Sequence, residues 1–473
     1  MNLIGRKQEI EVLKNIMESK QSEFVVVYGR RRVGKTFLID EFFNKDYSFY
    51  ATGLAEGGKA SQLKSFEMKL SEYGFKLKNK LKNWFDAFSC LIQLLEDKNV
   101  KRDITTNKRI IFLDELPWLD TPKSDFKSAF DYFWNSFCSK YDDIVLIVCG
   151  SATSWIINNL LSSTGGFYKR VTRKIYVPPF SLKECEQFFN RNNINYNKET
   201  IVETYMVFGG IPYYLNLLNY RLSLAQNIEY LFFMQNAPLK NELNDLLASL
   251  YKNHSNHLKV IRALAKNKKL GLSRNDIVSK TGLNGETLTS ILLELEECTF
   301  IRKYNNYLQN KKSHIYQLID PFIYFALDII EKQKTPSWMS FINTPTYYAW
   351  KGNSFELVCL NNIESVKEAL GINKIETNIY SWRSKKSLPG AQIDLLIDRG
   401  DQLINLCEMK FSSTPFSIDK KYEDELQNKL NCFINETKTK KSVHLTMITS
   451  NGLNHNLHSE IVLHELVLED LFY

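Results

Sequence analysis

Short apolar runs alternate with amphipathic stretches along the first part of the chain, up to about residue 174. The clearest runs are Phe24–Tyr28, Ile110–Leu113, Ile144–Cys149 and Ile175–Val177, with Tyr47–Ala51 as a weaker one. These runs are short and apolar at consecutive positions, which is typical of strands covered by helices on both faces. Strands that alternate with helices indicate a parallel sheet. The pattern therefore predicts an α/β domain over residues 1–180.

The rest of the chain divides into three further segments. Residues 181–252 have a helical pattern, interrupted by Gly209-Gly210-Ile211-Pro212, and we expect a helical lid there. Residues 253–320 predict three short helices followed by two strands, and this spacing resembles a winged helix-turn-helix. Residues 321–473 predict a linker and a second α/β domain. Its strands are expected at Gln392–Ile397, Leu403–Met409 and Val443–Thr449.

A complete phosphate-binding motif follows the first apolar run. Residues Gly29-Arg30-Arg31-Arg32-Val33-Gly34-Lys35-Thr36 match G-x-x-x-x-G-K-[ST] in full. The glycines let the backbone curl, so that successive N–H groups point at a phosphate beside the start of the next helix, Phe37–Phe43. Lys35 supplies charge to the β- and γ-phosphates, and the Thr36 hydroxyl is placed for Mg²⁺. The sequence therefore predicts nucleotide binding by the loop and Phe37.

Two acidic residues follow the second apolar run. Asp114 and Glu115 come directly after Ile110–Leu113, at the strand edge where ligands gather in open α/β sheets. We expect Asp114 to hold magnesium together with Thr36, and Glu115 to orient or deprotonate the attacking water. Acids at strand ends also serve as helix caps, but the separation from the phosphate-binding loop favours the catalytic interpretation.

Three polar residues near the later strands are further candidates. Ser151 follows the run Ile144–Cys149 and could sense the γ-phosphate, or it could simply cap a helix over Ala152–Leu161. Arg170 and Arg173 precede the next strand and could reach a phosphate in trans as an arginine finger. The alternative is that these arginines simply keep an exposed loop soluble.

These motifs together resemble the AAA-related ATPases that are abundant in archaea and occur in some bacteria, relatives of the STAND class of signalling NTPases. The resemblance is carried by Ile4-Gly5-Arg6-Lys7-Gln8-Glu9, the Walker A loop, Leu113-Asp114-Glu115, Gly150-Ser151, Pro178-Pro179-Phe180-Ser181 and Gly209-Gly210-Ile211-Pro212-Tyr213-Tyr214-Leu215. It implies ATP as the nucleotide. It also implies that Gly5, Arg6 and Pro212 contact the base or ribose, whereas Gly-Gly-Ile-Pro alone is just a turn.

The predicted winged-helix segment has an ambiguous charge pattern. Residues 255–315 contain eleven Lys or Arg against five Asp or Glu, which suits contact with nucleic-acid phosphates. The expected recognition helix, Gly285–Glu297, carries four glutamates and no basic residue. Polar groups near its start are limited to Asn284, Thr287 and Thr289, whereas major-groove readers usually offer Arg, Lys, Asn or Gln there. Both DNA contact and a regulatory arm on the ATPase fit this pattern.

The last domain carries a possible second site. The strands expected around Asp394 and around Glu408-Met409-Lys410 form a hairpin that brings these side chains together, since Glu408 and Lys410 share one strand face. Asp394 and Glu408 could share a divalent metal, Lys410 could polarise a water, and Glu356 could add a carboxylate. This arrangement resembles the restriction-endonuclease-like fold, PD-(D/E)XK. Members of the ATPase family named above often have such a domain at the end of the chain. Ile393 stands where that motif has proline.

Composition limits the possible partners and the cellular compartment, but it does not determine the function. The formal net charge of +8 over 473 residues permits an acidic partner such as nucleic acid. Eight cysteines without a C-x-x-C pair indicate reduced thiols and a cytoplasmic location. We expect no secretory signal and no membrane helix, since no apolar stretch approaches about 20 residues.

Three hypotheses on function follow. The first is a switch ATPase whose nucleotide state moves the lid and winged helix to control a partner. The second is a nucleic-acid enzyme whose last domain cuts DNA or RNA under ATP control. The third is a purely structural or interaction role with a dead nucleotide site, against which the intact Glu115 speaks. A nucleotide-binding interaction protein with no nuclease activity is a further alternative. A homo-oligomer or a protein partner is compatible with each of them.

Overall fold

The computed structural model describes residues 3–151, 154–162, 167, 169–251, 253–267, 271–305, 307, 314–332, 336–384 and 390–473. The chain forms two compact units, Met1–Pro178 and Pro179–Tyr473. The first unit ends close to the predicted boundary at residue 180. The boundaries predicted at residues 252 and 320 lie inside the second unit, so they stay predictions.

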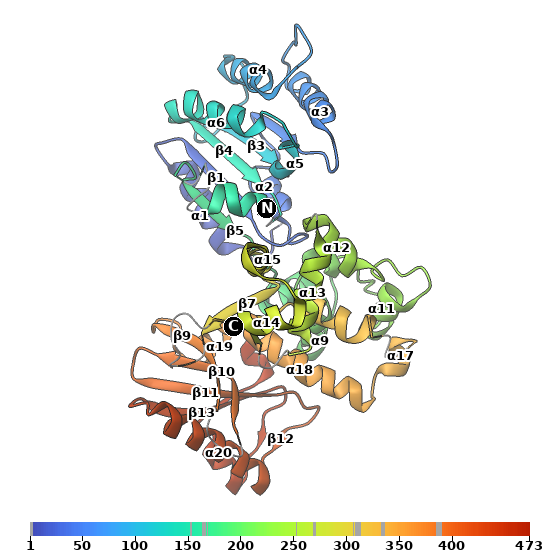
Figure 1. Cartoon of the computed structure of the whole chain (residues 1–473), viewed down its shortest axis with the longest axis vertical. Coiled ribbons are helices and arrows are strands. Elements are labelled where there is room, and N and C mark those ends of the chain that lie inside the picture. Colours follow the sequence, from blue (N-terminus) through green and yellow to red (C-terminus); the bar gives the residue numbers. More distant parts are fainter. Residues whose placement is uncertain are drawn as a thin grey trace. The chain divides into compact units, whose positions relative to one another are not determined.

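A five-stranded parallel sheet forms the centre of the first unit (Figure 1). Its spatial order is β2-β3-β4-β1-β5, and all four neighbouring pairs are parallel. The strands are β1 (Glu23–Tyr28), β2 (Phe49–Thr52), β3 (Arg109–Asp114), β4 (Ile144–Cys149) and β5 (Arg173–Tyr176). The predicted α/β class with a parallel sheet is thus confirmed, and each predicted apolar run overlaps one strand.

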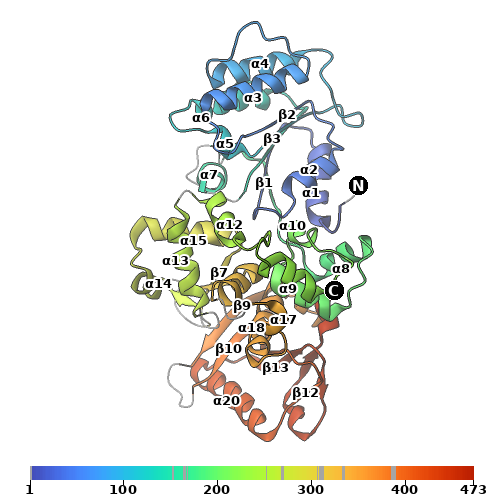
Figure 2. The same cartoon turned by 90° about the vertical axis from the view of Figure 1, so that its right-hand side faces the viewer.

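Helices cover this sheet on both sides. One face packs its alternate side chains, such as Phe24, Leu113 and Val148, against aromatic residues of three helices, including Trp84 and Phe130. These helices are α3 (Lys59–Glu72), α4 (Trp84–Glu96) and α6 (Phe126–Ser136). Figure 2 shows α1 (Lys7–Glu18) and α2 (Lys35–Phe42) lying together, away from α3 and α4. The short segments are α5 (Leu116–Leu119), η1 (Cys138–Lys140), α7 (Ser154–Ile156) and η2 (Ile157–Leu161).

The second unit begins with helices and a small sheet. Its helices up to residue 297 are α8 (Leu182–Arg191), α9 (Lys198–Phe208), α10 (Pro212–Leu215), α11 (Leu224–Ile228), η3 (Glu229–Phe233), α12 (Glu242–Leu250), α13 (His254–Ala265), α14 (Arg274–Thr281) and α15 (Gly285–Glu297). The antiparallel sheet has the order β6-β8-β7. Its strands are β6 (Leu272–Ser273), β7 (Ile301–Asn305) and β8 (His314–Leu318).

A mixed five-stranded sheet with the order β15-β13-β11-β10-β9 forms the last part of the second unit. The strands are β9 (Thr377–Arg383), β10 (Gln392–Arg399), β11 (Leu403–Lys410), β13 (Ser442–Thr449) and β15 (His464–Leu466). Apolar side chains of this sheet, such as Leu406 and Leu445, share a core with Leu426 and Phe433 of α20 (Lys420–Thr437).

The remaining elements of the second unit are mostly short. They are α16 (Pro321–Phe325), η4 (Ala326–Ile330), α17 (Trp338–Phe341), α18 (Pro345–Asn361), α19 (Ile363–Ala369), β12 (Phe416–Ser417), β14 (Leu453–Asn454), η5 (Leu457–Ile461) and η6 (Leu468–Phe472). Across the part of the chain that the structure describes, none of the helices combines the length and apolar character that crossing a bilayer requires.

Candidate functional site

The loop after β1 has the backbone of a phosphate cradle. Gly29 has a φ of 146°, and a Cβ on it would collide with the carbonyl oxygen of Val177. Gly34 and Arg32 also have positive φ, 87° and 72°, and Gly34 directly precedes α2. Positive φ at these positions curls the chain into the helix N-terminus, where N–H groups and the helix dipole favour an anion.

Lys35 is buried against this loop. Its Nζ donates hydrogen bonds to the carbonyl oxygens of Gly29 at 3.2 Å and Arg30 at 2.9 Å. The loop therefore holds the ammonium group by its own backbone, close to the curl into which phosphate would fit. Of the three loop arginines, Arg30 is buried, Arg31 is exposed and Arg32 is half-buried.

The structure brings Thr36 and Asp114 together. Thr36 Oγ1 donates to Asp114 Oδ2 at 2.9 Å, and Asp114 Oδ1 accepts from the backbone N–H of Glu115 at 2.9 Å. Asp114 ends β3 and is only 5% exposed. A hydroxyl and a carboxylate oxygen are hard ligands of the kind that Mg²⁺ prefers. These two residues therefore fit a magnesium ion bound with the nucleotide.

Glu115 lies at the same edge in an unusual backbone conformation, with a φ of 45°. Burial raises the pKa of its carboxyl group, and Asp114 raises it further. Lys35, Arg31 and the backbone N–H of Ser151 act in the opposite direction, but the pKa stays above its ordinary value. Ser151 thus reaches Glu115 through its backbone. Of the helix expected over Ala152–Leu161, Ala152 and Thr153 lie outside the described residues.

The two candidate finger arginines have partners within the first unit. Arg170 forms an ion pair with Asp131 and donates from Nε to Asn135 Oδ1 at 3.1 Å, both on α6. Arg173 Nη2 lies 3.7 Å from Glu23 Oε1. Their role toward a phosphate in trans stays a prediction.

The residues assigned to base or ribose contact lie in different places. Gly5 and Arg6 precede α1, and the Arg6 guanidinium donates to the carbonyl oxygens of Pro178 and Val33. Phe37 on α2 is 52% exposed, open for a ring contact. Pro212 begins α10 in the second unit, so its contact with nucleotide stays a prediction.

The Gly-Gly-Ile-Pro turn packs on the start of its own unit. A Cβ on Gly210 would collide with the carbonyl oxygen of Phe180, and the Phe180 N–H donates to the Gly210 carbonyl at 2.8 Å. The sequence presented these two segments only as separate parts of a resemblance. Their direct contact could not be read from spacing.

The carboxylates predicted in the last domain line one cavity of about 660 Å³. Asp394 on β10 stands one step beyond the registered pair Leu395–Cys407, which puts it opposite Glu408 on β11. Eight charged residues line the cavity: Glu356, Asp394, Glu408, Lys410, Lys421, Asp424, Glu425 and Lys429. The structure thus collects four side chains that the sequence predicted to meet, and adds lysines of α20.

Glu408 is tightly held in this cavity. Its Oε1 accepts from Tyr422 Oη at 2.9 Å and lies 3.2 Å from Lys410 Nζ, while Oε2 accepts from Lys429 Nζ at 2.6 Å. Burial alone would raise the pKa of Glu408, but Lys429 and Lys410 outweigh it, and the pKa lies below its ordinary value. Tyr422 and Lys429 were missed by sequence reasoning, although their spacing of two helical turns puts both on one face of α20.

The carboxylates of this cavity are not gathered around a single point in the structure. Asp394 accepts a hydrogen bond from Gln392, and both oxygens of Glu408 face ammonium groups. Within the described ranges, no three His, Cys, Asp or Glu side chains are grouped so as to hold one ion. The metal site expected from Glu356, Asp394 and Glu408 is therefore not assembled and stays a prediction.

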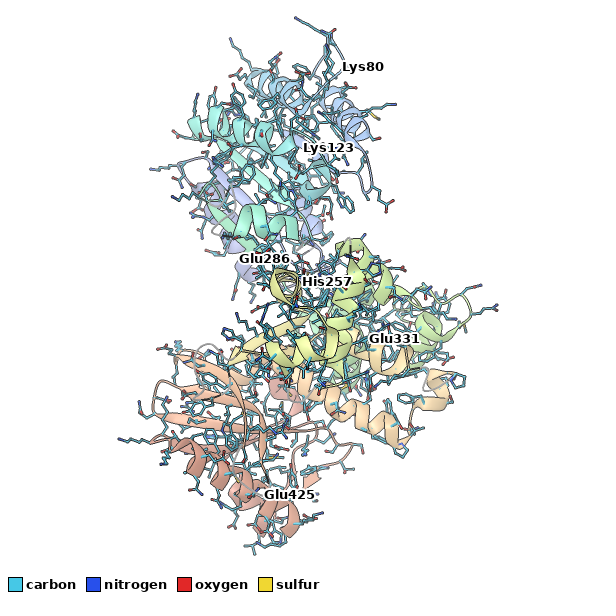
Figure 3. All side chains as sticks on the ribbon, viewed as in Figure 1. Lys80, Lys123, His257, Glu286, Glu331 and Glu425 are labelled. Atoms are coloured by element: carbon cyan, nitrogen blue, oxygen red, sulfur yellow. The ribbon has the colours of Figure 1, made fainter. Side chains whose placement is uncertain are left out.

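The predicted recognition helix has a basic neighbour that its own sequence lacks. Arg274 on α14 donates from Nη2 to the Gly285 carbonyl at 2.8 Å and to Thr289 Oγ1 at 2.9 Å. Glu286 lies at the start of this helix, α15 (Figure 3). The beginning of α15 thus combines an arginine with a glutamate, and charge alone does not select a nucleic-acid ligand.

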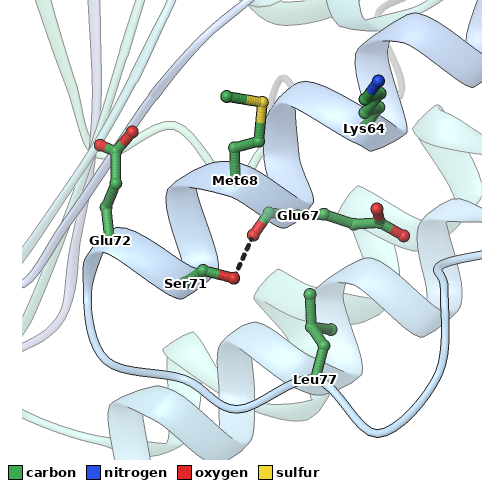
Figure 4. A pocket seen from close by; sticks show the side chains of 6 residues that line it. All are labelled: Lys64, Glu67, Met68, Ser71, Glu72 and Leu77. Carbon is green, nitrogen blue, oxygen red and sulfur yellow. Dashed lines mark hydrogen bonds between the residues drawn. The ribbon is translucent and has the colours of Figure 1, made fainter.

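A hollow of about 560 Å³ also lies beside α3 (Figure 4). It is lined by Lys64, Glu67, Met68, Ser71, Glu72 and Leu77. The Ser71 hydroxyl donates to the Glu67 carbonyl at 3.0 Å, a contact within one helix. These six residues do not converge on a common point, and we assign no function to them.

The phosphate-binding loop at the carboxyl edge of a parallel sheet defines the first unit as a P-loop domain. Residues 3–218 match the family model of an ATPase domain predominantly from Archaea.

Two relatives come from Methanocaldococcus jannaschii. The uncharacterized protein MJECL04 is 27% identical over 326 residues, covering 68% of this chain and 67% of the relative. The uncharacterized ATP-binding protein MJ0423 is 44% identical over 39 residues, covering 8% of this chain and 66% of the relative. The chain thus spans about two thirds of the length of each.

Solved structures that match the chain include the Walker-type ATPase PABY2304 of Pyrococcus abyssi, at 19% identity and a TM-score of 0.48; the match covers 69% of this chain and 97% of that one. The ORC2 protein of Aeropyrum pernix, in ADPNP–ADP complexes, matches at 12% identity with a TM-score of 0.41. The match covers 72% of this chain and 96% of that one. A STAND protein with a tetratricopeptide repeat sensor, PH0952 from Pyrococcus horikoshii, matches at 16% identity with a TM-score of 0.32. The match covers 79% of this chain and 52% of that one.

Proposed function

We propose that this protein binds ATP with Mg²⁺ at the Gly29–Thr36 loop and hydrolyses it, and that the nucleotide state controls the second unit. The observation that carries the proposal is the 2.9 Å hydrogen bond between Thr36 and Asp114. It joins the two motifs that a magnesium nucleotide needs: Thr36 lies on α2, which follows β1, and Asp114 ends β3, which β4 separates from β1 in the sheet.

Each residue has a defined task in this proposal. Loop N–H groups and the Lys35 ammonium bind the β- and γ-phosphates, and Thr36 with Asp114 holds the metal, which when bound neutralises charge between those phosphates. Glu115 orients the attacking water and accepts its proton. A carboxylate of raised pKa is a stronger base than an ordinary glutamate, so the burial of Glu115 suits it to this task.

The test is nucleotide binding by a Lys35→Ala variant. Removing the ammonium deletes a charge that stabilises the triphosphate, and we expect loss of ATP binding in isothermal titration with Mg²⁺. Lys64→Ala, an exposed lysine on α3, is the matched control and should bind like the wild type. Unchanged ATP affinity in Lys35→Ala would reject the assignment.

We further propose that residues 253–320 act as a winged-helix module. The order α13, β6, α14, α15, β7, β8 supports this, and Arg274 provides positive charge at the start of α15. DNA is the partner to test first, by measuring binding to duplex DNA at several salt concentrations. If Arg274→Ala leaves DNA binding unchanged, or if the protein does not bind DNA, the module is a regulatory arm.

A second candidate function is cleavage of phosphodiesters in the cavity of the last domain. It is favoured by one observation, that Glu356, Asp394, Glu408 and Lys410 line the same cavity. Asp394→Ala and Lys410→Ala should each remove cleavage of single- and double-stranded DNA or RNA in Mg²⁺ or Mn²⁺, while ATP binding persists. No cleavage by the wild type across these substrates would leave the domain as a binding module.

A further inference from the structure

Arg6 joins the phosphate-binding loop to the last residue of the first unit. Its guanidinium donates from Nη1 to the Pro178 carbonyl at 2.7 Å and from Nη2 to the Val33 carbonyl at 3.1 Å. The residue is only 4% exposed. A planar fork that donates to two carbonyls fixes their separation, which a single nitrogen does less well.

The backbone and the first turn of α1 hold Arg6 in this position. Gly5 and Arg6 have consecutive positive φ values of 63° and 56°. A side-chain-bearing residue in this region costs on the order of 1 kcal/mol or more, and persists where its surroundings fix it. Glu9 lies 3.6 Å from Nη1 and adds an ion pair. The guanidinium is thus positioned before any ligand arrives.

A second contact links the same two segments. The Val177 N–H donates to the Tyr28 carbonyl at 2.8 Å, and the adjacent Gly29 packs against the Val177 carbonyl. The loop therefore begins beside the chain that leaves the first unit, because β1 and β5 are neighbours in the sheet.

We propose that Arg6 is a positioning residue that transmits occupancy of the loop to the Pro178-Pro179 junction. This inference rests on the proposed binding of ATP. Phosphate draws loop N–H groups inward, so the peptide of Val33 turns and its carbonyl moves relative to Arg6. The two prolines at the junction have fixed φ, which limits how much of the displacement the junction absorbs, so part of it reaches the chain that enters the second unit.

The test is hydrogen–deuterium exchange of the full-length protein with and without Mg²⁺ and ATP. In the wild type, ATP should change exchange in peptides covering residues 172–182, which include the Val177 amide. The ATP affinity of Arg6→Ala is measured first, and with ATP at a saturating concentration this variant should lose the exchange change that the wild type shows. Arg102→Ala is the control, because Arg102 contacts Asp143 and Asn107 at the amino ends of β3 and β4, whereas the phosphate-binding loop lies at the carboxyl ends of the strands.

Arg6→Lys keeps the charge and tests the fork without deleting the side chain. It should bind ATP and give a smaller exchange change than the wild type; a change of equal size would overturn a role for the fork. Persistence of the full change in Arg6→Ala would overturn the coupling. Loss of ATP binding in both variants would instead make Arg6 a ligand contact. Absence of ATP binding by the wild type would overturn both this inference and the proposed function.

Discussion

Thr36 Oγ1 lies 2.9 Å from Asp114 Oδ2, with the hydroxyl donating to the carboxylate. The two residues come from α2 and β3, and β4 separates β3 from β1 in the sheet. Their contact therefore depends on the twist and packing of the whole sheet, and it offers the most direct test of the proposed site.

Removing either partner of this pair should slow hydrolysis. Thr36→Val deletes the hydroxyl while keeping the side-chain shape, and Asp114→Asn deletes the charge. We expect kcat to fall by about 100-fold or more in each, as for other losses of preorganised transition-state contacts, with a higher Mg²⁺ concentration needed for half-maximal rate. Thr36→Ser retains the hydroxyl and is the control. Wild-type magnesium dependence in Thr36→Val would argue against a metal contact.

Glu115→Gln should separate binding from hydrolysis. The amide keeps the size of the side chain but cannot accept a proton, so hydrolysis should fall by roughly 100-fold or more while ATP binding is retained. Single-turnover assays and titration with ATP measure the two properties separately. A variant that hydrolyses at the wild-type rate would exclude Glu115 as the base.

The raised pKa of Glu115 predicts the acid limb of the ATPase profile. Since burial keeps this carboxyl protonated to higher pH than an ordinary glutamate, kcat should begin to fall at a pH above 4.5. The same shift means that the folded state binds more protons than the unfolded state, so stability contributed by Glu115 falls as pH rises. Glu115→Gln should therefore gain thermal stability over the wild type at neutral pH, and this gain should shrink in acid.

The two lysines that contact Glu408 predict the opposite pH dependence of stability for the second unit; we call this pair, Lys410 and Lys429, the clamp. Lys429 and Lys410 hold the pKa of Glu408 below its ordinary value, so its stabilisation is present above about pH 4.5 and is lost as pH falls through the lower folded-state value. Lys429→Met should weaken this loss and reduce stability near pH 7. Lys440→Met, at an exposed lysine after α20, is the control, and equal acid melting curves for the two variants would contradict the clamp.

Gly29 should tolerate no side chain. Its φ of 146° and the nearby Val177 carbonyl make Gly29→Ala both strained and overlapping, and we expect a loss of more than about 2 kcal/mol in stability. Gly74→Ala shares a positive φ, 87°, but has no atom within 4 Å of the added Cβ, so it should cost about 1 kcal/mol. Chemical denaturation measures the free energy of unfolding of both variants, and the difference between their losses separates the effect of the collision from that of backbone strain.

The sequence predicted those parts of the site that depend on adjacent residues. The loop from Gly29 to Thr36 and the acids at the end of β3 each follow an apolar run, so the local pattern was sufficient to locate them. The partners of Arg6, which are backbone carbonyls, have no sequence signature. The same is true of Lys429, because its contact with Glu408 exists only after α20 packs on the sheet. Residues recruited by tertiary packing were therefore missed.

The strand order gives Cys149 an influence beyond its chemistry. This residue ends β4, is fully buried, and has a pKa raised well above its ordinary value by burial and then by the carboxylate of Asp114. Because β4 runs between the strands that carry the loop and the acids, residue 149 lies between the two motifs, and its thiol is in hydrogen-bond contact with Asp114. A bulkier side chain there would push against Asp114 and change its distance from Thr36, so a substitution at a residue with no part in the chemistry would disturb the nucleotide site.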